Sequence, residues 1–98
     1  MIEENMEPIH IGSIVLSLCG RDKNGVFAVV GTVESADGKT HLLVSDGRHH
    51  PLEHPKKKNP NHLQTMCSVP SEVLAALQEG TLTNRALSKV LSETQHQA

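Results

Sequence analysis

The fold of this chain is decided by the stretch Val26-Phe27-Ala28-Val29-Val30-Gly31-Thr32-Val33. Its many β-branched residues favour a β-strand. Because successive side chains of a strand point to opposite faces, Phe27, Val29 and Val33 share one face, and the other carries Val26, Ala28 and Val30. Both faces are apolar, so we expect both to be at least partly buried. The stretch is one of several short apolar runs, which is typical of a small all-β barrel or sandwich.

Four other strands are expected around this stretch, each bounded by turn residues. Ahead of it, residues 20–25 contain glycine and asparagine, which tolerate the positive φ of a tight turn. After it, Asp37-Gly38 and Asp46-Gly47 are hairpin signals that bracket one strand and indicate a meander. Pro51 lacks an amide proton and therefore suits a sheet edge or the end of a strand. The four expected strands cover residues 14–18, 41–45, 48–53 and 62–67.

From Ser68 onward, the apolar residues recur at helical spacing, which predicts two short helices. The first is expected to be capped by Ser68 or Ser71 and to end at Gly80, where a left-handed residue is favoured. The second is expected to be capped by Thr83 or Asn84. The apolar stripes consist of Val73, Leu74 and Leu77 in the first helix and of Ala86, Leu87, Val90 and Leu91 in the second.

The charge of the chain is unevenly distributed and divides it into three parts. Residues 1–8 carry three glutamates, net −3, and are expected to form a flexible acidic N-terminus. Residues 9–67 form the expected barrel, and they hold six of the seven histidines and a net charge of +2. Residues 68–93 form the helical extension, which we expect to pack on the barrel. The basic character of the chain is therefore confined to the expected barrel.

The length of 98 residues fits one domain with a thin core. No apolar run approaches the roughly 18 residues that cross a bilayer, and the acidic N-terminus lacks the features of a secretory signal. We therefore expect a cytoplasmic protein without a membrane partner. The spacing of Cys19 and Cys67 fits neither a disulfide scaffold nor a metal site, so each is expected to be a small buried residue. The chain lacks the common motifs of catalysis, and no enzymatic activity is expected.

Three short motifs resemble the KOW motif of ribosomal proteins and transcription elongation factors: Gly12-x-x-Val15, Gly20-Arg21-Asp22-Lys23 and Val29-Val30. The chain is also similar to small bacterial KOW-domain RNA-binding proteins over roughly residues 9 to 91. This resemblance implies an SH3-like five-stranded β-barrel, here followed by two short α-helices, and RNA binding. The family usually has glycine where this chain has Asn24, so close approach of the backbone to a phosphate is expected to be weaker there. The further segments that carry the similarity are residues 44–48, 52–58, 62–64 and 82–84.

An RNA-binding surface needs several cations that reach phosphates together, and the lysine run 56–58 between two prolines offers them. The alternative is a solvated lysine run. The resemblance favours RNA, and the expected partner is ribosomal RNA or the ribosome, including ribosomal proteins. The protein itself is expected to be a monomer. The expected RNA-binding residues are Arg21, Lys23, Asn24, Arg48, His49, His50, His54, Lys56, Lys57 and Lys58.

The scarcity of aromatic residues limits how RNA can be recognised. Phe27 is the single aromatic residue and is expected in the core, so bases cannot be stacked on several exposed Phe, Tyr or Trp rings. Recognition is therefore expected to rest on phosphates, sugar hydroxyls and RNA shape, with low sequence specificity.

The histidines allow two interpretations. A zinc site is disfavoured, because His49 and His50 are adjacent and would point to opposite faces of a strand, and no cysteine is near. No cofactor or metal is therefore expected. The other interpretation is electrostatic: protonation of the six histidines of the expected barrel would strengthen RNA binding as the pH falls from about 7.5 to 6.

A function from a different class remains open. Barrels of this family also serve as protein-interaction adaptors in transcription and translation complexes, and a net charge of −2 is unusual for a ribosomal component. The acidic N-terminus suits contact with a basic protein, or is a solvated tail. Salt dependence separates the two functions, because phosphate contacts weaken steeply with salt and an apolar interface does not.

Overall fold

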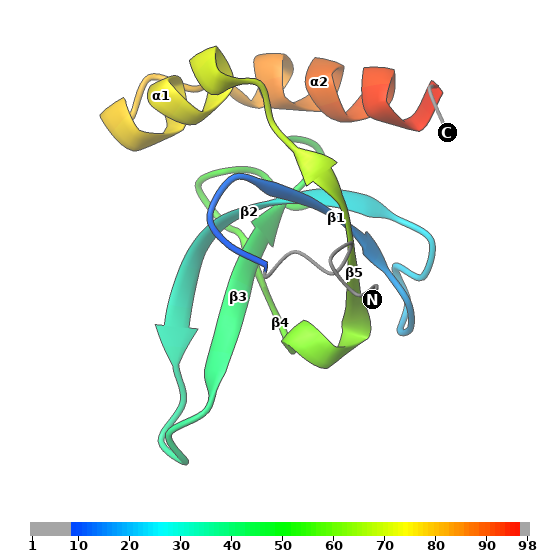
Figure 1. Ribbon diagram of the computed structural model, residues 1–98, viewed down its shortest axis with the longest axis vertical. Helices are drawn as coiled ribbons and strands as arrows, with labels where there is room; N and C mark the ends of the chain where they lie inside the picture. Colours follow the sequence, from blue (N-terminus) through cyan, green and yellow to red (C-terminus); the bar gives the residue numbers. More distant parts are fainter. Residues whose placement is uncertain (1–8, 97–98) are drawn as a thin grey trace, which may run out of the picture.

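The computed structural model describes residues 9–96, so the expected acidic N-terminus at residues 1–8 lies outside the described part of the chain. Five antiparallel strands form one sheet in the order β4-β3-β2-β1-β5, and two helices follow them (Figure 1). The fold is therefore mainly β, as expected. The strands are β1 (Ser13–Ser17), β2 (Val26–Glu34), β3 (Thr40–Ser45), β4 (Lys56–Lys58) and β5 (Leu63–Ser68); η2 (Pro60–His62) is a 3-10 turn, and the helices are α1 (Ser71–Glu79) and α2 (Asn84–His96).

The prediction of a strand at residues 48–53 is wrong. This segment lies in a long loop between β3 and β4, and the fourth strand is the lysine run itself, paired with β3. The cause is Asp46, whose Oδ1 accepts hydrogen bonds from the backbone amides of Arg48 at 2.9 Å and His50 at 2.8 Å. Amides that bond to a nearby side chain are taken out of a sheet ladder. Asp46-Gly47 therefore begins a compact loop, whereas Asp37-Gly38 forms the expected hairpin between β2 and β3.

Two hydrophobic clusters, one on each face of the sheet, confirm that β2 is buried on both sides. Phe27, 2% exposed, and Val29 face one cluster, and Val26 and Ala28 face the other, beneath the helices. The register of β2 against β3 shifts between Val29 and Gly31, and beyond this bulge the strand leaves the core, so Val33 is 38% exposed and not buried. The first cluster contains Val15, Phe27, Val29, Leu42, Val44 and Leu63; the second contains Ile14, Val26, Ala28, Val69, Leu87 and Leu91.

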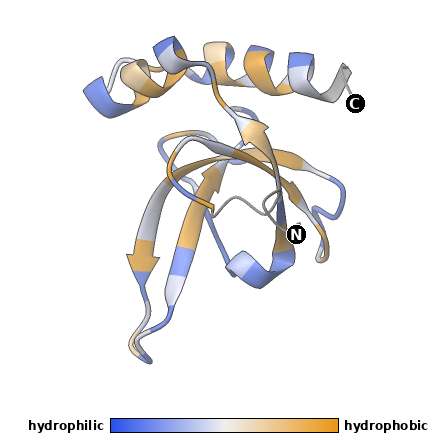
Figure 2. Ribbon diagram, in the orientation of Figure 1, coloured by the Kyte–Doolittle hydropathy of each residue, from blue (hydrophilic) through white to orange (hydrophobic). Residues whose placement is uncertain are grey.

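Both helices lie across one end of the sheet and present their apolar residues to it (Figures 1 and 2). Helix α1 ends at Gly80 in the left-handed conformation, as expected, but Pro70 precedes it and no serine caps it. Helix α2 is capped by Thr83, whose Oγ1 accepts from the amide of Ala86 at 3.1 Å. It places Leu87 and Leu91 in the core. The helices therefore supply apolar side chains to the second hydrophobic cluster.

Two smaller expectations concern the cysteines and the membrane. Cys67 is exposed on the edge strand β5 and Cys19 is half-buried, so the expectation that both are buried is wrong. Within residues 9–96, neither helix has the length and apolar character that crossing a bilayer requires.

Candidate nucleic-acid interface

The turn between β1 and β2 carries three of the expected RNA-binding residues, Arg21, Lys23 and Asn24. All three side chains are exposed. Asn24 has a φ of 74°, so it takes the left-handed conformation that the sequence predicts for it. Its amide donates to the carbonyl of Ser17 at 2.8 Å, and the amide of Gly25 donates to the carbonyl of Asp22 at 2.8 Å. These bonds hold the turn in a single compact shape.

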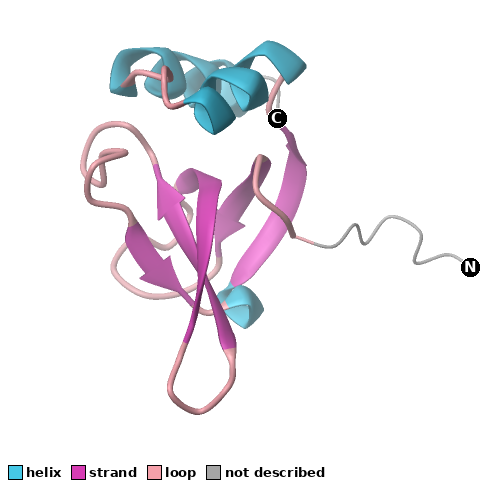
Figure 3. Ribbon diagram, turned by 90° about the vertical axis from the view of Figure 1, so that its left-hand side faces the viewer, coloured by secondary structure: helices cyan, strands magenta, loops and turns pink. Residues whose placement is uncertain are grey.

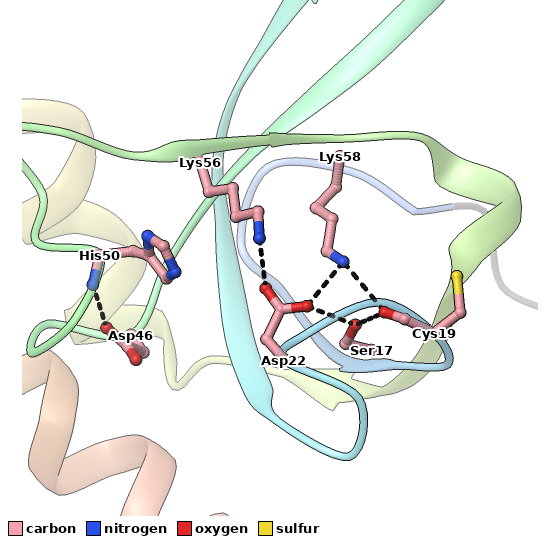
Figure 4. A network of polar contacts seen from close by, with 7 residues as sticks. All are labelled: Ser17, Cys19, Asp22, Asp46, His50, Lys56 and Lys58. Atoms are coloured by element: carbon pink, nitrogen blue, oxygen red, sulfur yellow. Dashed lines mark hydrogen bonds and ion pairs between the residues drawn. The ribbon is translucent and has the colours of Figure 1, made fainter.

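A charged network ties this turn to β4 (Figure 4). Lys56 Nζ donates to Asp22 Oδ2 at 2.9 Å, and Lys58 Nζ donates to Asp22 Oδ1, also at 2.9 Å. Ser17 is fully buried beneath them, and its Oγ lies 3.3 Å from Asp22 Oδ1 and 3.1 Å from the carbonyl oxygen of Cys19. We call these four side chains, of Ser17, Asp22, Lys56 and Lys58, the Asp22 network.

Asp22 is ionised in this setting. Burial on its own raises the pKa of the Asp22 carboxyl, but the hydrogen bonds from Lys58 and Lys56 and the positive charge of Lys58 outweigh it. The pKa is thereby held well below its usual range. A half-buried carboxylate that is charged and paired with two lysines links the turn to β4, and it neutralises part of the lysine charge.

The lysine run therefore differs from the group of free, phosphate-reaching cations that the sequence suggests. Lys58 is 7% exposed, and its amine is held by Asp22 and by the carbonyl of Cys19 at 3.4 Å. Lys56 is half-buried and shares the same carboxylate. Alternation along β4 places Lys57 on the opposite face, where it is exposed. Of the three lysines, Lys57 is thus the one whose charge is fully presented to solvent.

The loop between β3 and β4 carries His49 and His50, and its shape is fixed at both ends. Ser45 Oγ donates to the carbonyl of His50 at 2.7 Å, and Asp46 binds the amides described above. At the far end, the side chain of Asn84 in α2 accepts from the amide of Leu52 at 2.7 Å and donates to Glu53 at 2.9 Å. A side chain of α2 therefore anchors the loop that carries the histidines.

Glycine is required where this loop meets α2. Gly47 has a φ of 75°, and a Cβ atom placed on it would lie 2.5 Å from the carbonyl oxygen of Asn84 and 3.1 Å from the amide nitrogen of Ser88. Real Cβ atoms do not approach backbone so closely. The loop thus packs directly against the backbone of the helix, which positions the neighbouring histidines.

The turn, the loop and β4 together enclose an open groove of about 590 Å³, which we call the basic groove. Six of the ten expected RNA-binding residues line it, although they come from three separate segments. Phe27 and Gly25 also contribute to its wall. The six are Arg21, Lys23, Asn24, His49, His50 and Lys56.

The other four expected residues lie outside the basic groove. Arg48 lines an adjoining groove of about 230 Å³ together with His49 and with Ser88 and Ser92 of α2. His54 is exposed on the same loop, whereas Lys57 and Lys58 lie on β4 as described. The sequence does not predict that α2 lines this adjoining groove, because two serines four positions apart on a polar helix face are not a distinctive pattern.

The electrostatic character of the basic groove is set by the turn. Among the described residues, the two ion pairs are those of Asp22, so neither Arg21 nor Lys23 is paired with a carboxylate. Asp46 is also at the groove, but its Oδ1 is committed to loop amides. In the same part of the chain, no three histidine, cysteine or acidic side chains converge as metal ligands do. The groove therefore offers guanidinium, ammonium, imidazole and amide groups, together with the carboxylates of Asp22 and Asp46.

Comparison with protein-family models and curated protein sequences identifies no relative of this chain. No protein-family model matches the chain, and no curated protein sequence matches it. The function is therefore inferred from the residues of the chain and from their arrangement.

Proposed function

We propose that this protein is a non-catalytic RNA-binding protein that associates with ribosomal RNA or the ribosome in the cytoplasm. Its RNA site is the basic groove, with Arg48, His54 and Lys57 on the surrounding surface. Arg21 and Lys23 supply the principal phosphate contacts, since both are exposed and no carboxylate of the described chain pairs with them. Lys56 and Lys58 chiefly hold the Asp22 network, so their direct contribution is smaller.

A single observation carries this proposal: residues expected to bind RNA converge from three segments on one groove. The turn 20–25 lies more than 20 positions before the loop after β3 and the adjoining start of β4, yet the polar side chains of all three share one concave surface. Charged side chains that serve only solubility need not lie on one concave surface. A concave surface lined by cations and hydrogen-bond donors is the chemistry that a polyanionic backbone requires.

The arrangement of the KOW-like positions supports an SH3-like barrel of the KOW type. Gly12 has a φ of 98° and lies against Leu74, where a Cβ would approach that side chain to 3.1 Å. Val15 and Val29 are fully buried in the first hydrophobic cluster, with Phe27, and Asp22 forms the network described above. Each of these positions thus has a structural role of its own. The edge strands β4 and β5 are joined by the short turn η2, as expected of a sheet that curls into a barrel.

The test is RNA affinity across a salt series, with the charge of the turn reversed. We expect wild-type affinity for ribosomal RNA to fall steeply with salt. In Arg21→Glu/Lys23→Glu, the loss of two phosphate contacts should weaken binding and flatten the log–log salt slope by about 1.4 to 1.8. Both side chains are exposed, so the variant should fold.

The matched control is Lys39→Glu, in the hairpin between β2 and β3, where Lys39 is also exposed and distant from the groove in sequence. It changes the net charge in the same sense but should leave the salt slope unchanged. Equal losses in Lys39→Glu and in the turn variant would mean that only net charge matters, and would contradict a defined site. Glutamate at Lys58 is not a useful test, since it would place a second carboxylate beside Asp22 in a buried position.

The second candidate function is a protein-interaction adaptor, and a separate apolar groove favours it. This groove, of about 350 Å³, lies between the sheet and α1, and Glu53 contributes a carboxylate to its lining. The Asn84 hydrogen bond holds the pKa of Glu53 below its usual value, so the carboxylate is ionised at neutral pH. A partner that places an apolar side chain and a cation there would bind with little dependence on salt. The apolar lining comprises Val30, Leu43, Leu52, Pro55, Leu77 and Leu82.

A further inference from the structure

The basic groove is larger and more varied than phosphate binding alone requires. Its volume of about 590 Å³ falls within the range of about 300 to 1,000 Å³ that small-molecule sites occupy. A row of phosphates needs only a charged surface. A concave site that also contains imidazole rings and an amide side chain can take a planar heterocycle as well.

His50 presents an aromatic ring at this groove, and the backbone that carries the ring is held in place. Its backbone is held three times: the amide donates to Asp46 Oδ1 at 2.8 Å, and the carbonyl accepts from Ser45 Oγ at 2.7 Å and from the amide of Asp46 at 3.1 Å. The buried ring of Phe27 packs behind it, with the ring centroids 6.0 Å apart and the planes tilted by 49°. In Figure 4 the imidazole projects from the loop toward Lys56. A ring that is held before the ligand arrives binds a stacked base with little loss of entropy.

The turn between β1 and β2 supplies the remaining groups of a nucleotide site at the same groove. Asn24 is exposed there, and its amide side chain can both donate to and accept from the edge of a base. Arg21 and Lys23 stand on the same turn and can reach the phosphates on either side of that base. A stacking ring, an edge-reading amide and flanking cations are thus collected in one concavity.

We propose that the basic groove holds one unpaired base of a bound RNA, stacked on the imidazole of His50 and contacted at its edge by Asn24. This inference rests on the proposed function and makes it narrower: the preferred RNA is a folded one with a bulged or otherwise extruded nucleotide. Sequence-specific RNA recognition commonly uses such unstacked bases, and histidine rings serve as platforms for them. A count of Phe, Tyr and Trp overlooks this ring, so the sequence alone predicts phosphate and shape recognition.

The experiment compares a fully paired RNA hairpin with hairpins that differ from it only by one bulged nucleotide within the stem. Affinities of the full chain are measured by fluorescence anisotropy with fluorescently labelled RNA, for bulged A, C, G and U. We expect the best bulged stem to bind about tenfold more tightly than the fully paired stem, because loss of one stacked base typically changes affinity by about 5- to 150-fold. In His50→Ala this preference should disappear.

Three variants give the comparison its controls. His62→Ala removes an exposed histidine of η2 that lies outside the groove and should keep the preference. His50→Phe retains a ring without a titratable charge and should also keep it, which separates stacking from electrostatics. Asn24→Gly preserves the positive φ of the turn, removes the amide and should change which bulged base is preferred. If His50→Ala fails to fold by circular dichroism, the His50→Phe and Asn24→Gly arms still decide the question.

The outcomes separate this inference from the function on which it rests. Equal affinity for paired and bulged stems, or a preference lost equally in His62→Ala and His50→Ala, would overturn the base site and leave phosphate-led RNA binding intact. Absence of binding to either stem at low salt would overturn the proposed function itself. The mononucleotides AMP, CMP, GMP and UMP are titrated alongside; if one of them binds as tightly as a bulged stem, the groove is a site for free nucleotides and not for an RNA base.

Discussion

Replacing Asp22 by asparagine removes the charge at the centre of the Asp22 network with almost no change of shape. Lys58 would then lie 7% exposed without a counter-charge. Breaking a buried ion pair from one side typically destabilises a protein by about 3 to 5 kcal/mol. The asparagine can still accept hydrogen bonds from Lys58 and Ser17, so we expect the lower end, about 3 kcal/mol. For a domain whose stability is on the order of 5 to 15 kcal/mol, this is a large fraction.

Urea unfolding followed by far-UV circular dichroism measures this loss. Tryptophan and tyrosine are absent, so intrinsic fluorescence gives no useful signal. Lys56→Gln is the comparison within the same network, and because the Lys56 side chain is 35% exposed, its loss should lower the free energy of unfolding by about 1 kcal/mol or less. Asp22→Leu/Lys58→Met removes both buried charges and should recover much of the stability that Asp22→Asn loses.

The reasoning fails if Asp22→Asn lowers the free energy of unfolding by no more than Lys56→Gln does. Such a result would mean that the Lys58 ammonium finds water or another acceptor at little cost. The Asp22 network would then be an ordinary surface feature, and Lys58 would be available to a ligand after all.

The remaining predictions concern acid stability and the loop that meets α2. Because the folded-state pKa of Asp22 lies below its unfolded value of 3.8, the wild-type stability that it contributes should be complete above about pH 5 and fall as the pH drops below 3.8; acid titration of Asp22→Asn should show a shallower decline. Gly47→Ala should lower the free energy of unfolding by about 3 kcal/mol, through strain and a backbone clash, whereas Gly38→Ala, also at positive φ but in open space, should lower it by about 1 kcal/mol in the same urea assay. Asn84→Ala should destabilise the fold by about 1 to 2 kcal/mol and speed amide hydrogen exchange at Leu52.

Local patterns were sufficient to predict most of the secondary structure. The β-branched stretch of β2, the hairpin at Asp37-Gly38, the positive φ of Asn24 and the helix end at Gly80 all depend on near neighbours, and the structure confirms them. The strand expected at residues 48–53 failed because Asp46 captures the amides of its own loop. Alternating residue types do not reveal a side chain that competes with the sheet for hydrogen bonds.

The sequence indicates which residues belong to the candidate site but not how they are arranged. Six of the residues selected from the sequence line the basic groove, but pairing between Asp22 and lysines 34 and 36 positions away leaves no local signal. The lysine run therefore looked like the main phosphate contact, although two of its members hold the fold together. The His50 ring and its contact with Phe27 depend equally on tertiary packing, which periodicity does not report.

The junction between the loop and α2 determines what could be moved or removed by an engineer. Gly47 lies against the helix backbone, and Asn84 holds the loop at Leu52 and Glu53, so the histidine-bearing segment is shaped by residues near the C-terminus. A shortened chain that stops after β5 would keep all five strands of the sheet. It would nevertheless leave this segment without its anchor and expose the apolar surface beneath the helices. Figure 3 shows both helices above the strands. The five strands alone therefore do not transfer the loop in its observed shape, and a graft onto another protein would have to include α1 and α2.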